Sequence, residues 1–250
     1  MKTLLLTTLI TTQSLFALVS IAPVEIGKKP GFSNSIEGAL ETTRGNTEKD
    51  SYKVSARTTY DNNIDYIAWA EASGAYSKSN GKEDTNKLFA HTRYMHSITD
   101  KTFMGEIFIQ LQNDEFKRIN NRILGGGGVR LELFNLLQRG KGYFGIGGFY
   151  ENINYANSTI NPSENNLRVN SYFAYAIDLS KTSSVAYALY YQPKASDFSD
   201  TIQSHELELK LCVYRDLFLK FSISYDKDNR PPVGAQDYDL IQNTSFVYSF

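Results

Sequence analysis

Two serine–histidine pairs are the residues of this 250-residue chain whose types could carry out covalent chemistry. Ser97 follows His96, and Ser204 precedes His205. A serine nucleophile needs its histidine base within hydrogen-bond reach, but neighbouring residues of an extended strand point to opposite faces. The spacing therefore argues against catalysis. We expect a protein that is not an enzyme, with a lipid-active enzyme as the disfavoured alternative.

Metal, cofactor and phosphate chemistry are not predicted either. The three histidines and the single cysteine, Cys212, do not have the paired spacing of a zinc site. The run Gly125–Gly128 lacks the Lys-Ser/Thr that ends a phosphate-binding loop. We interpret these glycines as structural, because small residues leave room for large neighbours or permit a kink. A formal net charge of -1 also disfavours a nucleic-acid partner.

The remaining polar side chains alternate with apolar ones along the chain. Tyr52 and Val54 share one face of an extended segment, and Lys53 and Arg57 share the other. This period of two recurs from about residue 34 to residue 250 and predicts strands. Turn sequences such as Asn-Gly divide the segment into about twelve strands, with roughly 10 to 14 possible.

Both ends of the sequence agree with export to an outer membrane. Residues 1–20 combine one lysine with a short apolar run and predict a signal peptide, cleaved between 17 and 22. We expect a short periplasmic segment over 21–33 and a barrel over 34–250. Phe246, Tyr248 and Phe250 share one face of the last predicted strand, which resembles the C-terminal assembly signal of outer-membrane barrels.

The expected location is therefore the bacterial outer membrane. The expected partners are its lipids and, during biogenesis, the barrel-assembly machinery and periplasmic chaperones; the oligomeric state is left open. No other apolar segment approaches the length of a transmembrane helix. Because backbone groups in lipid must all be paired, the predicted fold class is an all-β, transmembrane, antiparallel up-and-down β-barrel. A soluble, lipocalin-like barrel is the alternative, but small residues on the apolar face suit lipid better than a packed core.

Counting strands from the N-terminus predicts which connections face outward. Longer connections near Asn161, Ser196 and Pro231 fall on the outer side, as in bacterial barrels. All six prolines fall in the leader, the N-terminal segment or the proposed loops, and none in a strand. Tyrosine and phenylalanine at both ends of the strands predict two aromatic girdles.

The face opposite the apolar one would line the lumen. The lumen-lining candidates are charged and nearly balanced in sign: Lys53, Arg57, Glu71, Arg93, Glu106, Arg122, Arg130, Glu132, Glu151, Arg168, Glu206, Glu208 and Lys210. A strongly selective pore would favour one sign. The balance leaves two interpretations open: ion pairs that cross the lumen, or side chains that hydrate a water-filled lumen.

The segment from Glu37 to Tyr155 resembles the YdiY-like family, a domain of unknown function (number 481) described as salt-induced outer-membrane proteins. The matching features are Gly45-Asn46-Thr47 after the first predicted strand, the Asn80-Gly81 turn, and Arg122-Ile123-Leu124 before the glycine run. The resemblance implies an outer-membrane barrel and carries over no catalytic residue or substrate.

Three functions are therefore considered. The first is a small porin-like channel for ions or small polar solutes. The second is a closed barrel with a charge-paired lumen and a structural or salt-stress role. The lipid-active enzyme is the third.

Overall fold

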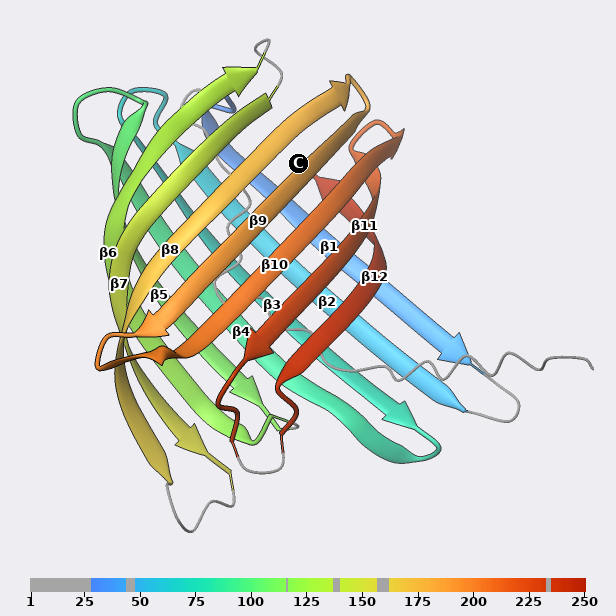
Figure 1. The fold of residues 1–250 in the computed structure, drawn as a ribbon. Coiled ribbons are helices and arrows are strands. Elements are labelled where there is room, and N and C mark those ends of the chain that lie inside the picture. The colour runs from blue at the N-terminus through green and yellow to red at the C-terminus, as the bar shows by residue number, and fades with distance from the viewer. Residues whose placement is uncertain (1–27, 44–47, 116, 137–139, 157–161, 233–234) are drawn as a thin grey trace, which may run out of the picture.

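The chain folds into a closed barrel of antiparallel strands (Figure 1). The computed structural model describes residues 28–43, 48–115, 117–136, 140–156, 162–232 and 235–250. The strands are β1 (Gly31–Thr43), β2 (Lys49–Asp61), β3 (Tyr66–Ser79), β4 (Lys82–Ser97), β5 (Phe103–Asp114), β6 (Ile119–Leu136), β7 (Gly140–Tyr155), β8 (Ser163–Ser180), β9 (Ser183–Lys194), β10 (Asp197–Tyr214), β11 (Leu217–Asp228) and β12 (Tyr238–Ser249). Each pairs with its sequence neighbours, and β12 returns to β1. The predicted up-and-down barrel of about twelve strands is confirmed.

The predicted signal peptide, residues 1–20, lies outside the described residues, and so does most of the segment 21–33. The Gly45-Asn46 turn and the connections near Gln138 and Asn161 also fall in undescribed stretches. No helix in the part of the chain that the structure describes is long and apolar enough to cross a membrane.

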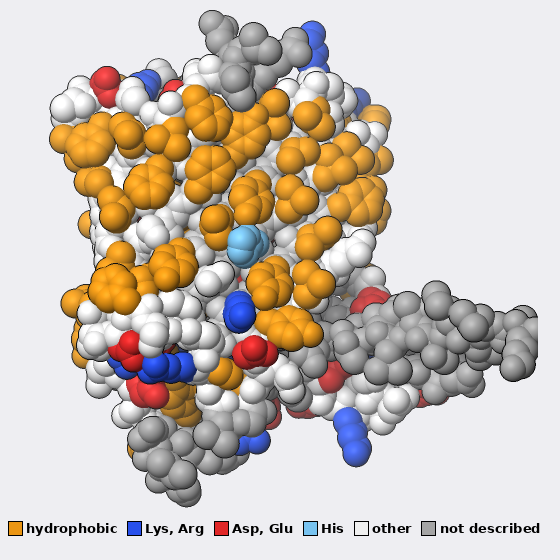
Figure 2. Space-filling model, viewed as in Figure 1, with side chains coloured by type: hydrophobic (Ala, Val, Ile, Leu, Met, Phe, Trp, Pro, Cys, Tyr) orange, Lys and Arg blue, Asp and Glu red, His pale blue; other side chains and the backbone are white. Residues whose placement is uncertain are grey.

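Alternation places apolar side chains on the outer face of the barrel. Val54, Leu88 and Ile107 are each more than half exposed, and Figure 2 shows hydrophobic side chains gathered across the visible face of the wall. Phe32, Tyr60, Tyr66 and Tyr94 follow one another at ring distances of 4.8, 5.9 and 5.5 Å. These rings form a ladder on the outer wall, near the end of the barrel where β1 begins.

Tight turns join the strands by local hydrogen bonding. Asn80 and Gly81 both have positive φ, 50° and 77°, which suits a two-residue hairpin between right-twisted strands. In the preceding turn, between β2 and β3, the side-chain oxygen of Asn62 accepts hydrogen bonds from the backbone N–H groups of residues 64, 65 and 66.

The connection after β9 differs from the prediction. β9 ends at Lys194 and β10 begins at Asp197, so the long outer loop expected near Ser196 is a two-residue turn. Pro193 lies within β9 and pairs with Thr201 across a register shift, so the expectation that no proline occupies a strand is wrong. A bulge in the neighbouring strand removes the regular ladder at this point, and proline is tolerated there.

Glycines shape the wall formed by β6 and β7. A Cβ on Gly128 would lie 2.5 Å from the Ile146 oxygen, and one on Gly147 would overlap the Gly127 oxygen. The two backbones therefore approach too closely for any side chain. Gly145, further along β7, makes room for the ring of Tyr172.

The closure between β1 and β12 is short. β1 pairs with β2 along its whole length, from Gly31–Asp61 to Thr43–Lys49. Its register with β12 runs only from Ser35–Ser249 to Gly38–Phe246, extended by two hydrogen bonds between Asn34 and Phe250. We call this junction the seam; beyond it the two strands diverge (Figure 1).

Candidate functional site

The lumen of the barrel is the candidate functional site, and its centre is filled. Arg93 and Glu106, from β4 and β5, form an ion pair of 3.1 Å with side chains 0% and 1% exposed. The Tyr172 hydroxyl of β8 donates a 2.8 Å hydrogen bond to the same Glu106 carboxylate. The Arg93 guanidinium also lies 5.5 Å from the ring centre of Trp69 and 4.8 Å from that of Phe108. We call these five residues the waist cluster.

Apolar side chains extend the waist cluster across the lumen. Ile67 and Trp69 of β3 belong to one buried cluster with Ala188 and Tyr190 of β9, strands on opposite sides of the closed sheet. Met95 and Met104 complete the packing between them. Part of the cross-section is therefore a packed core.

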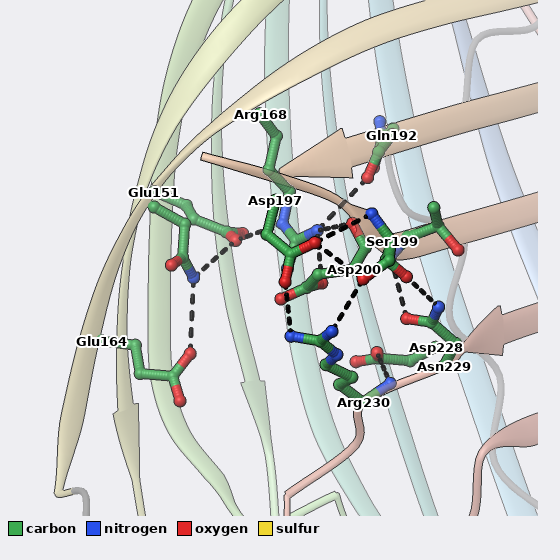
Figure 3. Close-up of polar contacts among 12 residues, drawn as sticks. Glu151, Glu164, Arg168, Gln192, Asp197, Ser199, Asp200, Asp228, Asn229 and Arg230 are labelled. Atoms are coloured by element: carbon green, nitrogen blue, oxygen red, sulfur yellow. Dashed lines mark hydrogen bonds and ion pairs between the residues drawn. The ribbon is translucent and has the colours of Figure 1, made fainter. Parts of the chain in front are cut away.

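A second network lies toward the end of the barrel where β7 ends and β8 begins, and it is centred on Glu151 (Figure 3). The Glu151 carboxylate accepts hydrogen bonds from both Arg122 and Arg168, the latter at 2.8 Å, and it is fully buried. Arg168 continues to Asp200 at 3.0 Å, and Asn166 donates to Glu151 at 3.2 Å. One carboxylate thus holds two guanidinium groups from β6 and β8. We call Glu151, Arg122, Arg168 and Asp200 the loop-end cluster.

Beyond the loop-end cluster, Arg230 anchors the segment after β11. Its guanidinium lies 2.8 Å from Asp197 and donates to the Ser199 hydroxyl at 2.7 Å (Figure 3). Asn229 accepts a hydrogen bond from the Thr201 backbone at 2.8 Å. The residues that form the bulge of β10 therefore also hold this connection.

A third network lies at the seam and is centred on Glu37. Its carboxylate accepts hydrogen bonds from Lys220 at 2.6 Å and from Ser245 at 2.7 Å, and Lys53 lies 3.9 Å away. Lys220 also contacts Glu208 at 3.2 Å. We call these five residues the seam cluster. It joins β1 to β2, β10, β11 and β12 from the inside.

The remaining lumen candidates lie between these clusters. Arg57 faces Glu71 at 3.9 Å, and Glu132 accepts a hydrogen bond from Lys141 at 3.2 Å. Arg130 lies over the Tyr143 ring at 4.3 Å, and Lys210 over the Phe218 ring at 4.2 Å. Glu206 lines the cavity described next.

A cavity of about 680 Å³ occupies the side of the lumen that the waist cluster leaves open. Its walls come from β1, β2 and β3 on one side and from β10, β11 and β12 on the other. Charged side chains of both signs line it, including Glu37, Lys53, Arg57, Glu71, Glu206, Glu208, Lys210 and Lys220. It extends to Asp216 and Phe250, at the end of the barrel where the chain terminates.

Toward the opposite end, the cavity reaches Lys87. Lys87 pairs across strands with Asp114, and Lys117 contacts Asp239 at 2.5 Å. Asp226 sits directly across from Asp239. We call these five residues the gate cluster. Three of them, Lys117, Asp226 and Asp239, also line a separate pocket of about 70 Å³, on the side of the cluster away from the charged cavity.

Two of the three histidines have tyrosine neighbours. The Nδ1 atom of His96 lies 3.4 Å from the Tyr94 hydroxyl, and that of His205 lies 2.9 Å from the Tyr187 hydroxyl. His205 is on the outer face, whereas Ser204 is buried on the inner one. Within the described ranges, no group of three or more His, Cys, Asp or Glu residues is placed to hold a metal ion.

Sequence reasoning overlooked the aromatic and methionine side chains of the lumen. Trp69, Met95, Phe108 and Tyr172 are at most 3% exposed and point inward. Their inward direction could have been predicted from the sequence, because the period of two places each of them on the face assigned to the lumen. Glu37 was also overlooked, although it lies on the inner face of the first strand.

Comparison with known proteins supports the fold. The model of the family described as "Protein of unknown function, DUF481" matches residues 36–250. No curated protein matches the chain. Among solved structures, the COG4313 outer membrane channel from Pseudomonas putida F1 is 10% identical with a TM-score of 0.57, covering 93% of this chain and 100% of that one.

Two further structures are less similar. The translocator domain of the autotransporter NalP from Neisseria meningitidis is 10% identical with a TM-score of 0.48, covering 87% of this chain and 86% of that one. The KdgM porin in complex with disordered oligogalacturonate is 9% identical with a TM-score of 0.44, covering 87% and 96%. The similarity to the Pseudomonas putida channel shows the fold of outer-membrane β-barrel proteins, and with a family match over residues 36–250 the chain belongs to the DUF481 family of proteins of unknown function.

Proposed function

We propose that this protein is a narrow outer-membrane channel for small polar solutes, with its passage narrowed by the gate cluster. The observation that carries the proposal is the 680 Å³ cavity, which is lined by charges of both signs and extends to one end of the barrel. A structural barrel has no need of a charged cavity of this size, because desolvated charges are expensive unless they are paired or hydrated.

The charge pattern of the cavity predicts the class of solute. Lys220 stands between Glu37 and Glu208, and Arg57 stands opposite Glu71. A wall whose charges alternate in sign favours neutral or zwitterionic solutes over simple anions and simple cations. We therefore expect weak selectivity between anions and cations.

The test is a recording of single-channel currents from refolded protein in a planar lipid bilayer, with a salt gradient. Stable small steps with a reversal potential near zero support the channel. A strongly shifted reversal potential would contradict the expected weak selectivity.

The closed barrel is the second candidate, and the waist cluster favours it. Arg93, Glu106 and Tyr172 fill the centre of the lumen without solvent access. Absence of current from protein shown to be folded and inserted would support this candidate and refute the channel.

A further inference from the structure

The short seam leaves two strand edges without a cross-strand partner. Continuing the register of Gly38–Phe246 would pair Leu40 with Thr244 and Glu41 with Asn243, but the pairing of the described strands stops before these positions. On its other side, β12 remains paired with β11 down to Tyr238–Lys227. The gap is therefore confined to the junction of β1 with β12.

This gap lies at the level of the lipid-facing belt. Leu240 and Phe246 border the unpaired stretch of β12 and are 59% and 57% exposed on the outer face. Leu40, on the facing edge of β1, is 81% exposed. Backbone groups left unpaired in hydrocarbon are costly, so these edges need water or a polar group as a partner.

The sequence of the unpaired stretch departs from the alternation seen in the paired strands. Gln242, Asn243, Thr244 and Ser245 are all polar, so neither face of β12 is apolar at this level. The Asn243 side-chain nitrogen is buried and has no hydrogen-bond acceptor. This stretch is suited to a polar environment that reaches it from the lumen.

The charged cavity lies directly behind the seam. Its lining includes Ser35 and Glu37 of β1 and Val247 and Ser249 of β12. At this point Glu37 faces two ammonium groups, from Lys220 at 2.6 Å and Lys53 at 3.9 Å. Lys220 also contacts Glu208 at 3.2 Å, and Ser245 of the unpaired stretch donates a hydrogen bond to Glu37. The wall of the cavity nearest the gap therefore presents paired charges of both signs.

We propose that the unpaired stretch beside the seam is a lateral portal for a single-chain amphiphile with a zwitterionic head group. The cationic part of the head binds at Glu37 and Glu208, its anionic part binds at Lys53 and Lys220, and the apolar chain passes between β1 and β12 into the hydrocarbon layer. The proposal rests on the proposed function, because it takes the cavity as a solute path, and it narrows the solute class to one that exchanges with the membrane.

The first test measures whether the seam is open in a membrane. In a Cys212→Ser background, cysteines at Glu41 and Asn243 are compared with a control pair at Ser35 and Ser249, which are in register. We expect the control pair to form a disulfide on mild oxidation and the Glu41/Asn243 pair to remain reduced. Rapid disulfide formation in both pairs, or disulfides between two copies of the chain at Glu41/Asn243, would overturn the portal.

The second test uses Trp69, the only tryptophan of the chain, as a probe of entry. Its ring lies 5.1 Å from the guanidinium of Arg57, a cavity-lining residue. Bromododecylphosphocholine added to vesicles containing the protein should quench Trp69 fluorescence in a saturable way. A bulky methanethiosulfonate label on Asn243→Cys should lower this quenching several-fold, and dithiothreitol should restore it.

The matched control carries the same label at Ser171→Cys, on the outer side of β8, where it pairs with Ile146 of β7 and Tyr191 of β9, and should quench like the unlabelled protein. Quenching that the Asn243→Cys label leaves unchanged would refute the portal, because the amphiphile would then act from the bilayer or enter elsewhere. Single-channel currents from the same preparations separate the two proposals: currents without seam-dependent quenching would overturn the portal alone.

Discussion

Glu151 is the residue at which buried charge has its clearest structural consequence. The Glu151 carboxylate forms ion pairs with both Arg122 and Arg168, and Glu151 is not exposed to solvent. Removing one member of a buried network leaves the others charged and unpaired, which costs far more than losing a surface pair. A few buried, charged side chains of this kind therefore determine how the lumen is arranged.

Glu151→Gln should lower the free energy of unfolding by about 3–5 kcal/mol. The measurement is urea unfolding of the refolded protein in lipid vesicles. Glu132→Gln, at the partly exposed pair with Lys141, is the control and should lower the free energy of unfolding by about 1 kcal/mol or less. Equal losses in the two variants would show that the loop-end cluster is solvated.

Asp100, in the connection between β4 and β5, predicts a pH dependence outside the membrane. Its carboxylate accepts a 2.9 Å hydrogen bond from the Thr102 backbone, which lowers the pKa of Asp100 below its usual 3.8. A lowered pKa in the folded state stabilises the protein above the unfolded pKa, and this stabilisation is lost as pH falls through the folded pKa.

Asp100→Asn should therefore be less stable than the wild type at pH 7, and the difference should vanish in strong acid. Unfolding curves of both proteins from pH 7 down to about 2 provide the test. A difference that persists unchanged in strong acid would contradict the assigned hydrogen bond.

At the scale of the strands, alternation was sufficient to predict the element type, the two faces and most turns. It failed at Pro193, because a bulge in β10 is a tertiary feature without a local signature. The filled waist was missed for a similar reason: Phe108 and Tyr172 lie on the face assigned to the lumen, but only the three-dimensional closure shows that they meet. The glycine run was correctly interpreted as structural.

The contact between β6 and β7 predicts a graded effect of adding one methyl group. Gly147→Ala should destabilise the barrel by about 1–3 kcal/mol or prevent folding, because the new Cβ would overlap the Gly127 oxygen. Gly38→Ala is the matched control, since no atom lies within 4 Å of its Cβ position. Heat-modifiability on unboiled gels and urea unfolding measure both. Similar stability of the two variants would show that the strands lie further apart.

At the scale of the whole molecule, the sequence was enough to predict a closed barrel of about twelve strands. It could not predict how the lumen is divided, because the interior depends on how long side chains from distant strands fold across it. The waist cluster joins β3–β5 to β8 and β9, and the gate cluster joins β4 to β12. Beside these contacts lies the charged cavity, which is the basis of the proposed channel.

The proposed channel is narrowed by the gate cluster, so the first measurement is the conductance of Lys117→Gln. This change removes the ion pair with Asp239 at 2.5 Å, and Lys82→Gln, at an exposed position at the start of β4, is the control. We expect larger single-channel steps for Lys117→Gln than for the wild type and the control. Identical conductance in all three folded proteins, or no current from any of them, would contradict this expectation.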